Sequence, residues 1–448
     1  MTKTRSHDDR MRLAAVVAAG IAARGAIYAL PALQQTLAAR PELVTPVSSV
    51  RRVAEGAFLF DHVGSPYAGD VFHQPPLVFA LFYPIFGLLD AAKELQYAAM
   101  CALFIAIDVL IACGFARLAR RTLALEEGET PVHENKEIWL HRIPVSPLFT
   151  PDNLPVMAAF ISLFNPYSLA SSGAMATVSL THLSVLYSLV YAAEGATSAS
   201  MLCVAVGTYL SLYPLALLLP IVLLLQRVYS KQPPASQPTA AKLVASSAVS
   251  FAIWLSFLAY LSYSMSGGWG FLEETYVWIA KYSDLTPNVG IFWYFFMEVF
   301  DRFIPYFLFV LHLHPCIYVF PLYLRMKHRP QAFASALIGI FSLFQAYPSF
   351  GDFGFFLTAI SLHPKTIMSI ENRYVYALGI GVATCMLPVM WFLWLFPASG
   401  NANFFYNQTL VYQVFNSQIV TAFIGASMKR DKDLLKYRKR MQATQKKE

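Results

Sequence analysis

Apolar runs of about 20 residues recur along the whole chain, separated by short polar and charged stretches. A run of this length crosses a hydrocarbon core roughly 30 Å thick as a helix, so the pattern predicts an all-α polytopic membrane protein with about 12 transmembrane helices. The expected crossings are residues 12–32, 75–117, 154–173, 178–193, 199–212, 214–228, 242–264, 303–324, 331–347, 352–363, 373–396 and 404–424.

Segment 75–117 departs from the simple pattern because it holds two apolar stretches around Lys93 and Glu94. An odd number of crossings keeps the basic residues that follow it on the same side as the N-terminus. We therefore interpret one of its two stretches as a half-helix or an interfacial helix. Segments 199–212 and 352–363 are short for full spans, so the pattern allows ten to fourteen crossings.

Composition supports the membrane assignment, since 57% of the 448 residues are hydrophobic and only 13% are charged. Most Lys and Arg residues fall between the apolar runs, in zones 3–12, 117–142, 227–242, 325–373 and 429–447. By the positive-inside tendency these zones, and with them both termini, are cytosolic. The net charge of +7 therefore predicts contact with anionic lipid headgroups rather than with nucleic acid.

This orientation predicts one membrane domain over residues 1–448, with its polar segments divided between the two sides. We expect a first lumenal loop at 34–74, a cytosolic loop at 118–152, a lumenal loop at 265–302 and a basic cytosolic tail at 425–448. Aromatic residues followed by acids predict an interfacial helix in the second lumenal loop.

That predicted helix carries Trp293, Tyr294 and Phe295 ahead of Glu298 and Asp301. Two carboxylates three residues apart lie on one face of a helix, and acids at membrane depth are costly unless they meet water, a partner or a ligand. The helix is interpreted either as lining a site for acyl chains and an amine-bearing headgroup or as pairing internally with the adjacent arginine.

Two asparagines, Asn401 and Asn403, precede Phe404 at the predicted lumenal start of the last span. Their amides both donate and accept hydrogen bonds, which suits sugar hydroxyls. Helix capping is the alternative, because asparagine is a favoured N-cap residue.

The first lumenal loop holds Asp61, His62, Asp70 and His73 within a short stretch. Their spacing matches no standard ligand pattern, so we assign no metal and interpret them as a polar rim or as loop hydrogen bonds. Intramembrane Arg24 and Asp108 pair with each other, with lipid phosphate or with a partner subunit.

Five strings occur together in the chain: SSVRRVAEG, HVGSPYAGDVFHQPPL, LSLYPLALLLP, DLTPNVGIFWYFFMEVFDRF and SGNANFFY. In order and spacing they resemble the class-U subunit of the glycosylphosphatidylinositol (GPI) transamidase complex. The resemblance implies a subunit of the endoplasmic reticulum membrane that helps attach preassembled GPI anchors to proteins. It also implies partner subunits, including a cysteine-protease-like subunit that carries out the transamidation.

The same strings resemble, more faintly, the membrane-embedded mannosyltransferases of GPI assembly, which implies a glycosyltransferase-C-like bundle. That family places acidic catalytic residues in the first lumenal loop, where a carboxylate deprotonates the acceptor hydroxyl. Here Thr45–Val53 contains no carboxylate, and the nearest acids are Glu42, Glu55 and Asp61. We therefore expect a pseudo-glycosyltransferase that binds a lipid-linked glycan without catalysis.

The resulting hypothesis is a noncatalytic subunit, without metal or cofactor, that binds the GPI lipid and presents it for attachment to proteins. A dolichol-phosphate-dependent mannosyltransferase and a purely structural membrane subunit are the alternatives. The candidate lipid or glycan contacts are Asn288, Trp293, Tyr294, Phe295, Glu298, Asp301, Asn401, Asn403, Phe404, Asp61 and His73.

Overall fold

The computed structural model describes residues 2–88, 92–126, 146–234 and 237–445, and the regular structure in these ranges is helical. The first half comprises α1 (Thr2–Tyr28), α2 (Pro31–Ala38), α3 (Val50–Val63), α4 (Pro76–Leu88), α5 (Lys93–Glu126), η1 (Pro147–Phe149), α7 (Leu154–Phe164), α8 (Pro166–Gly173), α9 (Val178–Ala193), α10 (Thr197–Leu210), η2 (Tyr213–Leu217) and α11 (Leu218–Tyr229). The second half comprises α12 (Ala240–Ser266), the π-helical η4 (Glu273–Val277), α13 (Trp278–Lys281), α14 (Phe292–Glu298), η5 (Asp301–Phe303), α15 (Ile304–Ile317), α16 (Val319–Met326), α17 (Pro330–Phe344), α18 (Phe350–Ser361), α19 (Pro364–Met368), α20 (Arg373–Leu395) and α21 (Ala402–Gln445).

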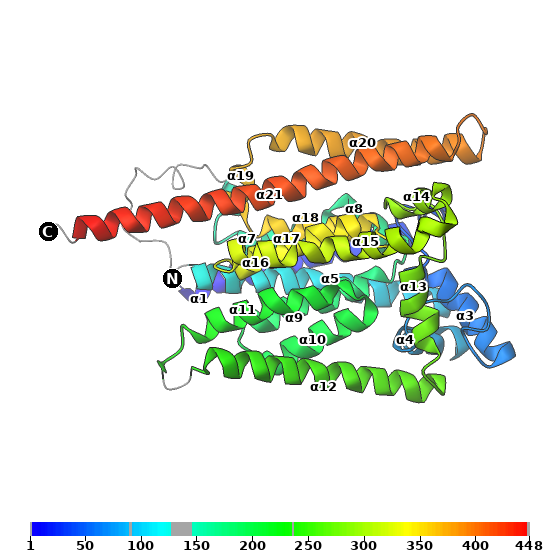
Figure 1. The fold of residues 1–448 in the computed structure, drawn as a ribbon, viewed down its shortest axis with the longest axis horizontal. Helices are drawn as coiled ribbons and strands as arrows, with labels where there is room; N and C mark the ends of the chain where they lie inside the picture. The colour runs from blue at the N-terminus through cyan, green and yellow to red at the C-terminus, as the bar shows by residue number, and fades with distance from the viewer. Residues whose placement is uncertain (1, 89–91, 127–145, 235–236, 446–448) are drawn as a thin grey trace.

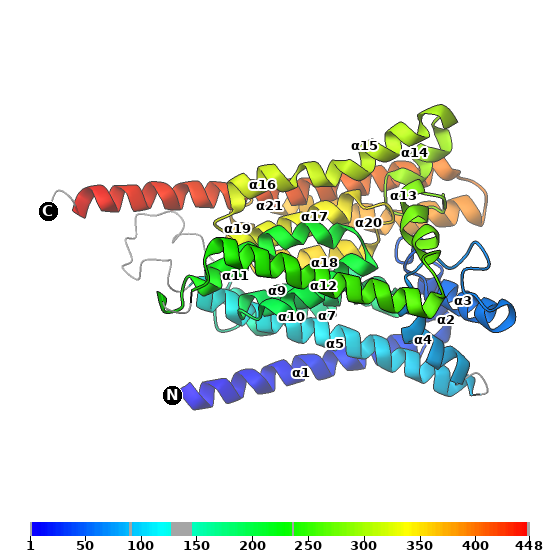
Figure 2. The same ribbon diagram turned by 60° about the horizontal axis from the view of Figure 1, so that its bottom comes forward.

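The long helices run roughly along one axis, and both termini lie at the same end of the bundle (Figures 1 and 2). The opposite end carries α3, α4, α13, α14 and the start of α21. The predicted loops 34–74 and 265–302 therefore share one end. Which compartment each end faces remains a prediction.

Within the described part of the chain, five helices are long and apolar enough to cross a membrane. They are Asp9–Tyr28, Lys93–Leu125, Ala240–Ser266, Asp301–Met326 and Arg373–Leu395. The bent pair α7 and α8 adds a sixth if it is one span. The expected count of about 12 transmembrane helices is not confirmed. Six other apolar helices of the described chain have only 10–17 residues, and α21 carries several Asn and Gln residues within its predicted span, 404–424.

Segment 75–117 forms two unequal helices, as expected. α4 has 13 residues and α5 has 34, so α5 alone is long enough to traverse the bundle. α4 stays near the end where α5 begins (Figure 2). α4 is too short for a full span, and its assignment as a half-helix or an interfacial helix stays a prediction.

Local sequence explains where several helices begin, bend and end. Ser49 caps α3 by accepting a hydrogen bond from the Arg52 amide, and Gly64 ends it with a left-handed φ of 82°. Pro166 lacks the amide donor that would continue α7, so α7 and α8 meet at 47° and the Asn165 side chain caps α8.

Two intramembrane charges meet inside the bundle. Arg24, which is 1% exposed, lies with Nε 2.5 Å from Asp108 Oδ2, and its Nη1 donates to the Leu163 carbonyl at 3.0 Å. Of the three partners considered from the sequence, the structure selects the mutual pair. A buried pair of this kind avoids an uncompensated charge in the membrane interior.

The predicted polar segments at the terminal end differ in how far they can be described. The cytosolic loop expected at 118–152 begins as the last turns of α5, and its centre, residues 127–145, lies outside the described residues. The basic tail continues α21 as one helix to Gln445. This last part of α21 projects beyond the other helices (Figures 1 and 2).

Candidate functional site

α14 and the start of α21 are joined by aromatic rings. Tyr294 stacks on Tyr406 with centroids 4.6 Å apart, and Trp293 meets the same ring edge-on at 5.5 Å. The Tyr406 hydroxyl donates to the Ile291 carbonyl at 3.2 Å. These contacts fix the two segments against each other, although they are about a hundred residues apart in sequence.

Polar and apolar side chains remain exposed around this aromatic contact. Glu298 is exposed at the last position of α14, one turn after Tyr294. Desolvation, followed by the influence of the nearby Glu298 carboxylate, raises the pKa of Tyr294. Asn403 and Phe404 are exposed in the first turn of α21, one turn before Tyr406. A carboxylate, an amide and an aromatic ring are thus accessible on adjoining elements.

The expected continuous helix through Glu298 and Asp301 is wrong. Val299 and Phe300 have extended ψ angles of 140° and 138°, so α14 ends at Glu298 and Asp301 begins the separate turn η5. The two carboxylates therefore do not share a helical face. Arg302, the arginine proposed as their internal partner, lies over the Phe303 ring with 4.6 Å between the guanidinium carbon and the centroid.

Three other candidates have structural partners inside the chain. Phe295 packs edge-on against Phe307 at 4.9 Å. The Asn401 side chain accepts a hydrogen bond from the Phe404 amide at 3.3 Å, which is the capping arrangement considered from the sequence. Asn288 is fully buried, donates to Tyr282 and Thr286, and accepts from the Gly290 amide.

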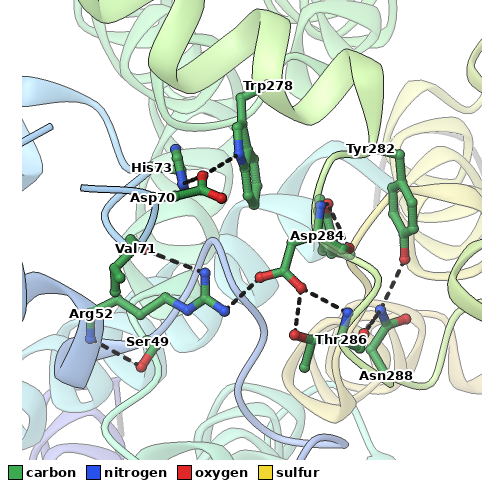
Figure 3. Close-up of polar contacts among 11 residues, drawn as sticks. Ser49, Arg52, Asp70, Val71, His73, Trp278, Tyr282, Asp284, Thr286 and Asn288 are labelled. Carbon is green, nitrogen blue, oxygen red and sulfur yellow. Dashed lines mark hydrogen bonds and ion pairs between the residues drawn. The ribbon is translucent and has the colours of Figure 1, made fainter. Parts of the chain in front are cut away.

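An ion pair links the two polar loops at this end of the bundle (Figure 3). Arg52 Nη2 on α3 lies 2.6 Å from Asp284 Oδ2, and both side chains are about four-fifths buried. Asp284 also accepts hydrogen bonds from the amide and hydroxyl of Thr286. Burial alone would raise the pKa of Asp284, but the bonds from Thr286 and the Arg52 guanidinium outweigh it and hold the pKa below its usual value. We call this arrangement the interloop clasp.

His73 supports the same clasp from the first loop. Its ring is 1% exposed, stacks on Trp278 at 3.8 Å, and its Nδ1 lies 2.8 Å from the Glu274 carbonyl. His73 Nε2 is 3.1 Å from Asp70 Oδ1, although this contact is not aligned as a hydrogen bond. Trp278 Nε1 donates to the same Asp70 oxygen at 3.3 Å (Figure 3). His73 therefore holds the loops together and is shielded from solvent.

Asp61 lies apart from these residues. It is exposed on α3 and accepts a hydrogen bond from the Tyr83 hydroxyl at 2.8 Å. Among the described residues, no group of three or more His, Cys, Asp or Glu side chains is arranged to hold a metal ion.

The stretch without a carboxylate, Thr45–Val53, borders a polar cavity of about 80 Å³. Thr45, Ser48 and Gln74 line it, and Asp352 is the acid among the described residues of its lining. Asp352 accepts from the amide and hydroxyl of Ser349 and lies 3.2 Å from His182 Nε2, so it caps α18 and is engaged within the fold.

Sequence reasoning missed the clasp pair itself. Arg52 and Asp284 both stand inside the recognised strings, but neither had been singled out as a candidate. The available signal was an arginine in one predicted polar loop and an aspartate in the other. Only the fold shows that these positions, more than two hundred residues apart, face each other.

Comparison with known proteins decides the family. The sequence model of the family described as "PIG-U: GPI transamidase subunit PIG-U" matches residues 18–412. The chain belongs to the PIG-U family. It is similar to the human protein named "GPI-anchor transamidase component PIGU", with 30% identity over 94% of both chains. It is 29% identical to the Saccharomyces cerevisiae "GPI transamidase component GAB1" over 92% of this chain and 94% of the relative.

Membership of the PIG-U family confirms the recognition made from the five strings and supports a role as a GPI transamidase component in GPI-anchor biosynthesis. The Schizosaccharomyces pombe relative, "GPI transamidase component GAB1 homolog", shares 27% identity over 86% of each chain. Because all three relatives are named as components, the chain is expected to work with other subunits of the complex.

Proposed function

We propose that this chain is a noncatalytic subunit of GPI transamidase that binds the GPI lipid and presents it to a catalytic, cysteine-protease-like partner subunit. In this proposal the chain lies in the endoplasmic reticulum membrane with both termini cytosolic. The end that carries α14 and the clasp then faces the lumen, where the GPI headgroup and the protein substrate meet.

The observation that carries the proposal is the contact between Tyr294 and Tyr406, which joins α14 to the start of α21. Glu298 lies one helical turn after Tyr294, Asn403 and Phe404 lie within one turn before Tyr406, and all three side chains are exposed. A carboxylate suits the amine of an ethanolamine headgroup, an amide suits sugar hydroxyls, and aromatic rings suit sugar faces or acyl chains. We call Glu298, Asn403 and Phe404 the glycolipid edge.

The other candidates contribute to this edge indirectly. Trp293, Tyr294 and Phe295 fix α14 in place, and Asn401 caps the helix that presents Asn403. Asn288 and His73 shape the adjoining loops through internal bonds. Asp301 lies beyond the break in α14 and Asp61 lies on α3, so we place both outside the edge.

A noncatalytic role is supported by how the acids near the first loop are used. Asp352, on the wall of the cavity beside Thr45–Val53, is committed to capping α18 and to His182, and Asp61 bonds Tyr83. Asp352 is therefore held by bonds within the fold, and exposed Asp61 lies on α3 with one oxygen bonded to Tyr83, away from this cavity. The proposal therefore favours lipid presentation over mannosyl transfer.

Complementation in cells that lack the endogenous subunit tests the proposal. Glu298→Gln and Asn403→Ala are expected to lower surface display of a GPI-anchored reporter while the other subunits still co-purify with this chain. Losing one charge-assisted hydrogen bond corresponds to roughly tenfold weaker binding. Glu273→Gln, an exposed acid at the same end of the bundle, is the matched control and should display the reporter normally. Normal display with both edge variants would refute the site.

A further inference from the structure

A second cavity, of about 370 Å³, lies where α2, the start of α3, the end of α4 and the start of α5 meet. Its volume falls within the range of small-molecule binding pockets. The candidate lipid and glycan residues considered above do not line it. Residues 44–50 separate it from the polar cavity, with Thr45 and Ser48 on that side and Val44 and Ser49 on this one.

The lining of this second cavity is amphiphilic. Apolar side chains, among them Val44, Phe86 and Met100, form much of its surface. Its polar groups include the amides of three glutamines and the guanidinium of Arg51, which is the charged member of the lining. The cavity therefore combines apolar walls with donors suited to a negative charge.

Arg51 is held at the cavity by one backbone contact. Its Nη2 donates to the Gln35 carbonyl on α2 at 3.1 Å, which uses one of the five N–H donors of the guanidinium. Gln34 and Gln35 on α2 and Gln96 on α5 add amide groups around it. A planar guanidinium with neighbouring amide donors suits the oxygens of a phosphate group.

The walls are fixed by hydrogen bonds between helices. The lining Tyr97 donates to the Tyr28 carbonyl at 2.9 Å, and the Tyr28 hydroxyl donates to the Ser172 carbonyl at 2.7 Å. The two residues beside the lining glutamines, Leu33 on α2 and Leu95 on α5, are 41% and 55% exposed. A preformed cavity flanked by exposed apolar side chains suits a ligand with an acyl chain that continues into the bilayer.

We propose that this cavity binds one glycerophospholipid of the surrounding bilayer. Its phosphate lies beside Arg51 and the glutamine amides, and one acyl chain passes over Phe86 and Met100 toward the exposed leucines. The apolar walls disfavour a free inorganic anion, and Arg51 disfavours an uncharged lipid. This lipid site is separate from the glycolipid edge and does not depend on it.

Native mass spectrometry of the purified full chain in detergent, titrated with phosphatidylglycerol and without any GPI, measures this binding. We expect one phospholipid to bind, and chain-matched diacylglycerol, which lacks the phosphate, to bind at least tenfold more weakly. Arg51→Gln should weaken phosphatidylglycerol binding roughly tenfold through the lost charge-assisted bond. Ala54→Trp should abolish binding by filling the cavity from α3.

Two matched variants control for charge and bulk. Lys281→Gln removes an exposed cation at the same end of the bundle, and Ala98→Trp adds the same bulk at an exposed position of α5. Neither residue lines the cavity, so both variants should bind phosphatidylglycerol as the unaltered chain does. The proposal is overturned if Arg51→Gln and Ala54→Trp bind as well as these controls, if diacylglycerol binds equally, or if the site fills only when GPI is supplied.

Discussion

Asp284→Asn removes one charge of the interloop clasp while keeping the size and most of the shape of the side chain. The Arg52–Asp284 pair has side chains 22% and 18% exposed, which places it between surface and buried pairs. Exposed pairs contribute about 0–1 kcal/mol, and breaking a buried pair costs about 3–5 kcal/mol. We therefore expect a coupling between Arg52 and Asp284 of about 1–3 kcal/mol.

A double-mutant cycle isolates that coupling from the other effects of each substitution. Native-state hydrogen exchange gives the local opening free energies of residues 49–53 and 284–288 for Arg52→Gln, Asp284→Asn and the double variant. The exposed Lys281–Glu273 pair, at 63% and 60% exposure, supplies a parallel cycle expected to give less than about 1 kcal/mol. Equal couplings in the two cycles would refute the assignment of the clasp as the link between the loops.

Further predictions follow from the pH response and from packing. The pKa of Asp284 is lowered in the fold, so its contribution to clasp stability is present above about pH 4 and is lost as the pH falls through the lower, folded pKa. Hydrogen exchange of residues 284–288, measured as a function of pH, would reveal this loss. Arg24→Gln leaves Asp108, whose side chain is 13% exposed, without its ion-pair partner, so it should destabilise the chain by about 3–5 kcal/mol in thermal denaturation. Joint replacement of both residues by Leu should recover much of that loss. A Cβ at Gly379 would collide with the Phe415 ring, so Gly379→Ala should lower the melting temperature. Gly381→Ala on the same helix should not, because a Cβ there meets no atom of a neighbouring element within 4 Å.

The sequence predicted the positions of several helices well, but it did not predict where others end or how many of them are long enough to span a membrane. Residues 178–193 form α9 as expected, and 373–396 closely match α20. Apolar length could not decide the span count, because several segments end early at polar or proline positions. The break at Asn165–Pro166 is one case, where a predicted single crossing becomes two helices at 47°.

The sequence also allowed the unusual residues to be placed at one end of the bundle, because charge placement constrains which loops lie together. It did not predict the roles of the individual residues. The sequence left Asn401 open between glycan contact and helix capping and offered Asn288 as a candidate contact. In the fold, backbone amides within three residues occupy the side-chain oxygens of both. The break after Glu298 depends on local backbone angles that a regular spacing of acids cannot reveal. Arg52 and Asp284 needed the tertiary fold to meet.

Lipid analysis of the assembled complex tests the central claim most directly. GPI bound to purified complexes containing the unaltered chain, the Glu298→Gln/Asn403→Ala double variant or the Glu273→Gln control is quantified by mass spectrometry, together with subunit stoichiometry. The account predicts equal assembly in all three and at least tenfold less GPI with the double variant only. Equal GPI in all three complexes would contradict lipid presentation by this edge and favour a purely structural subunit.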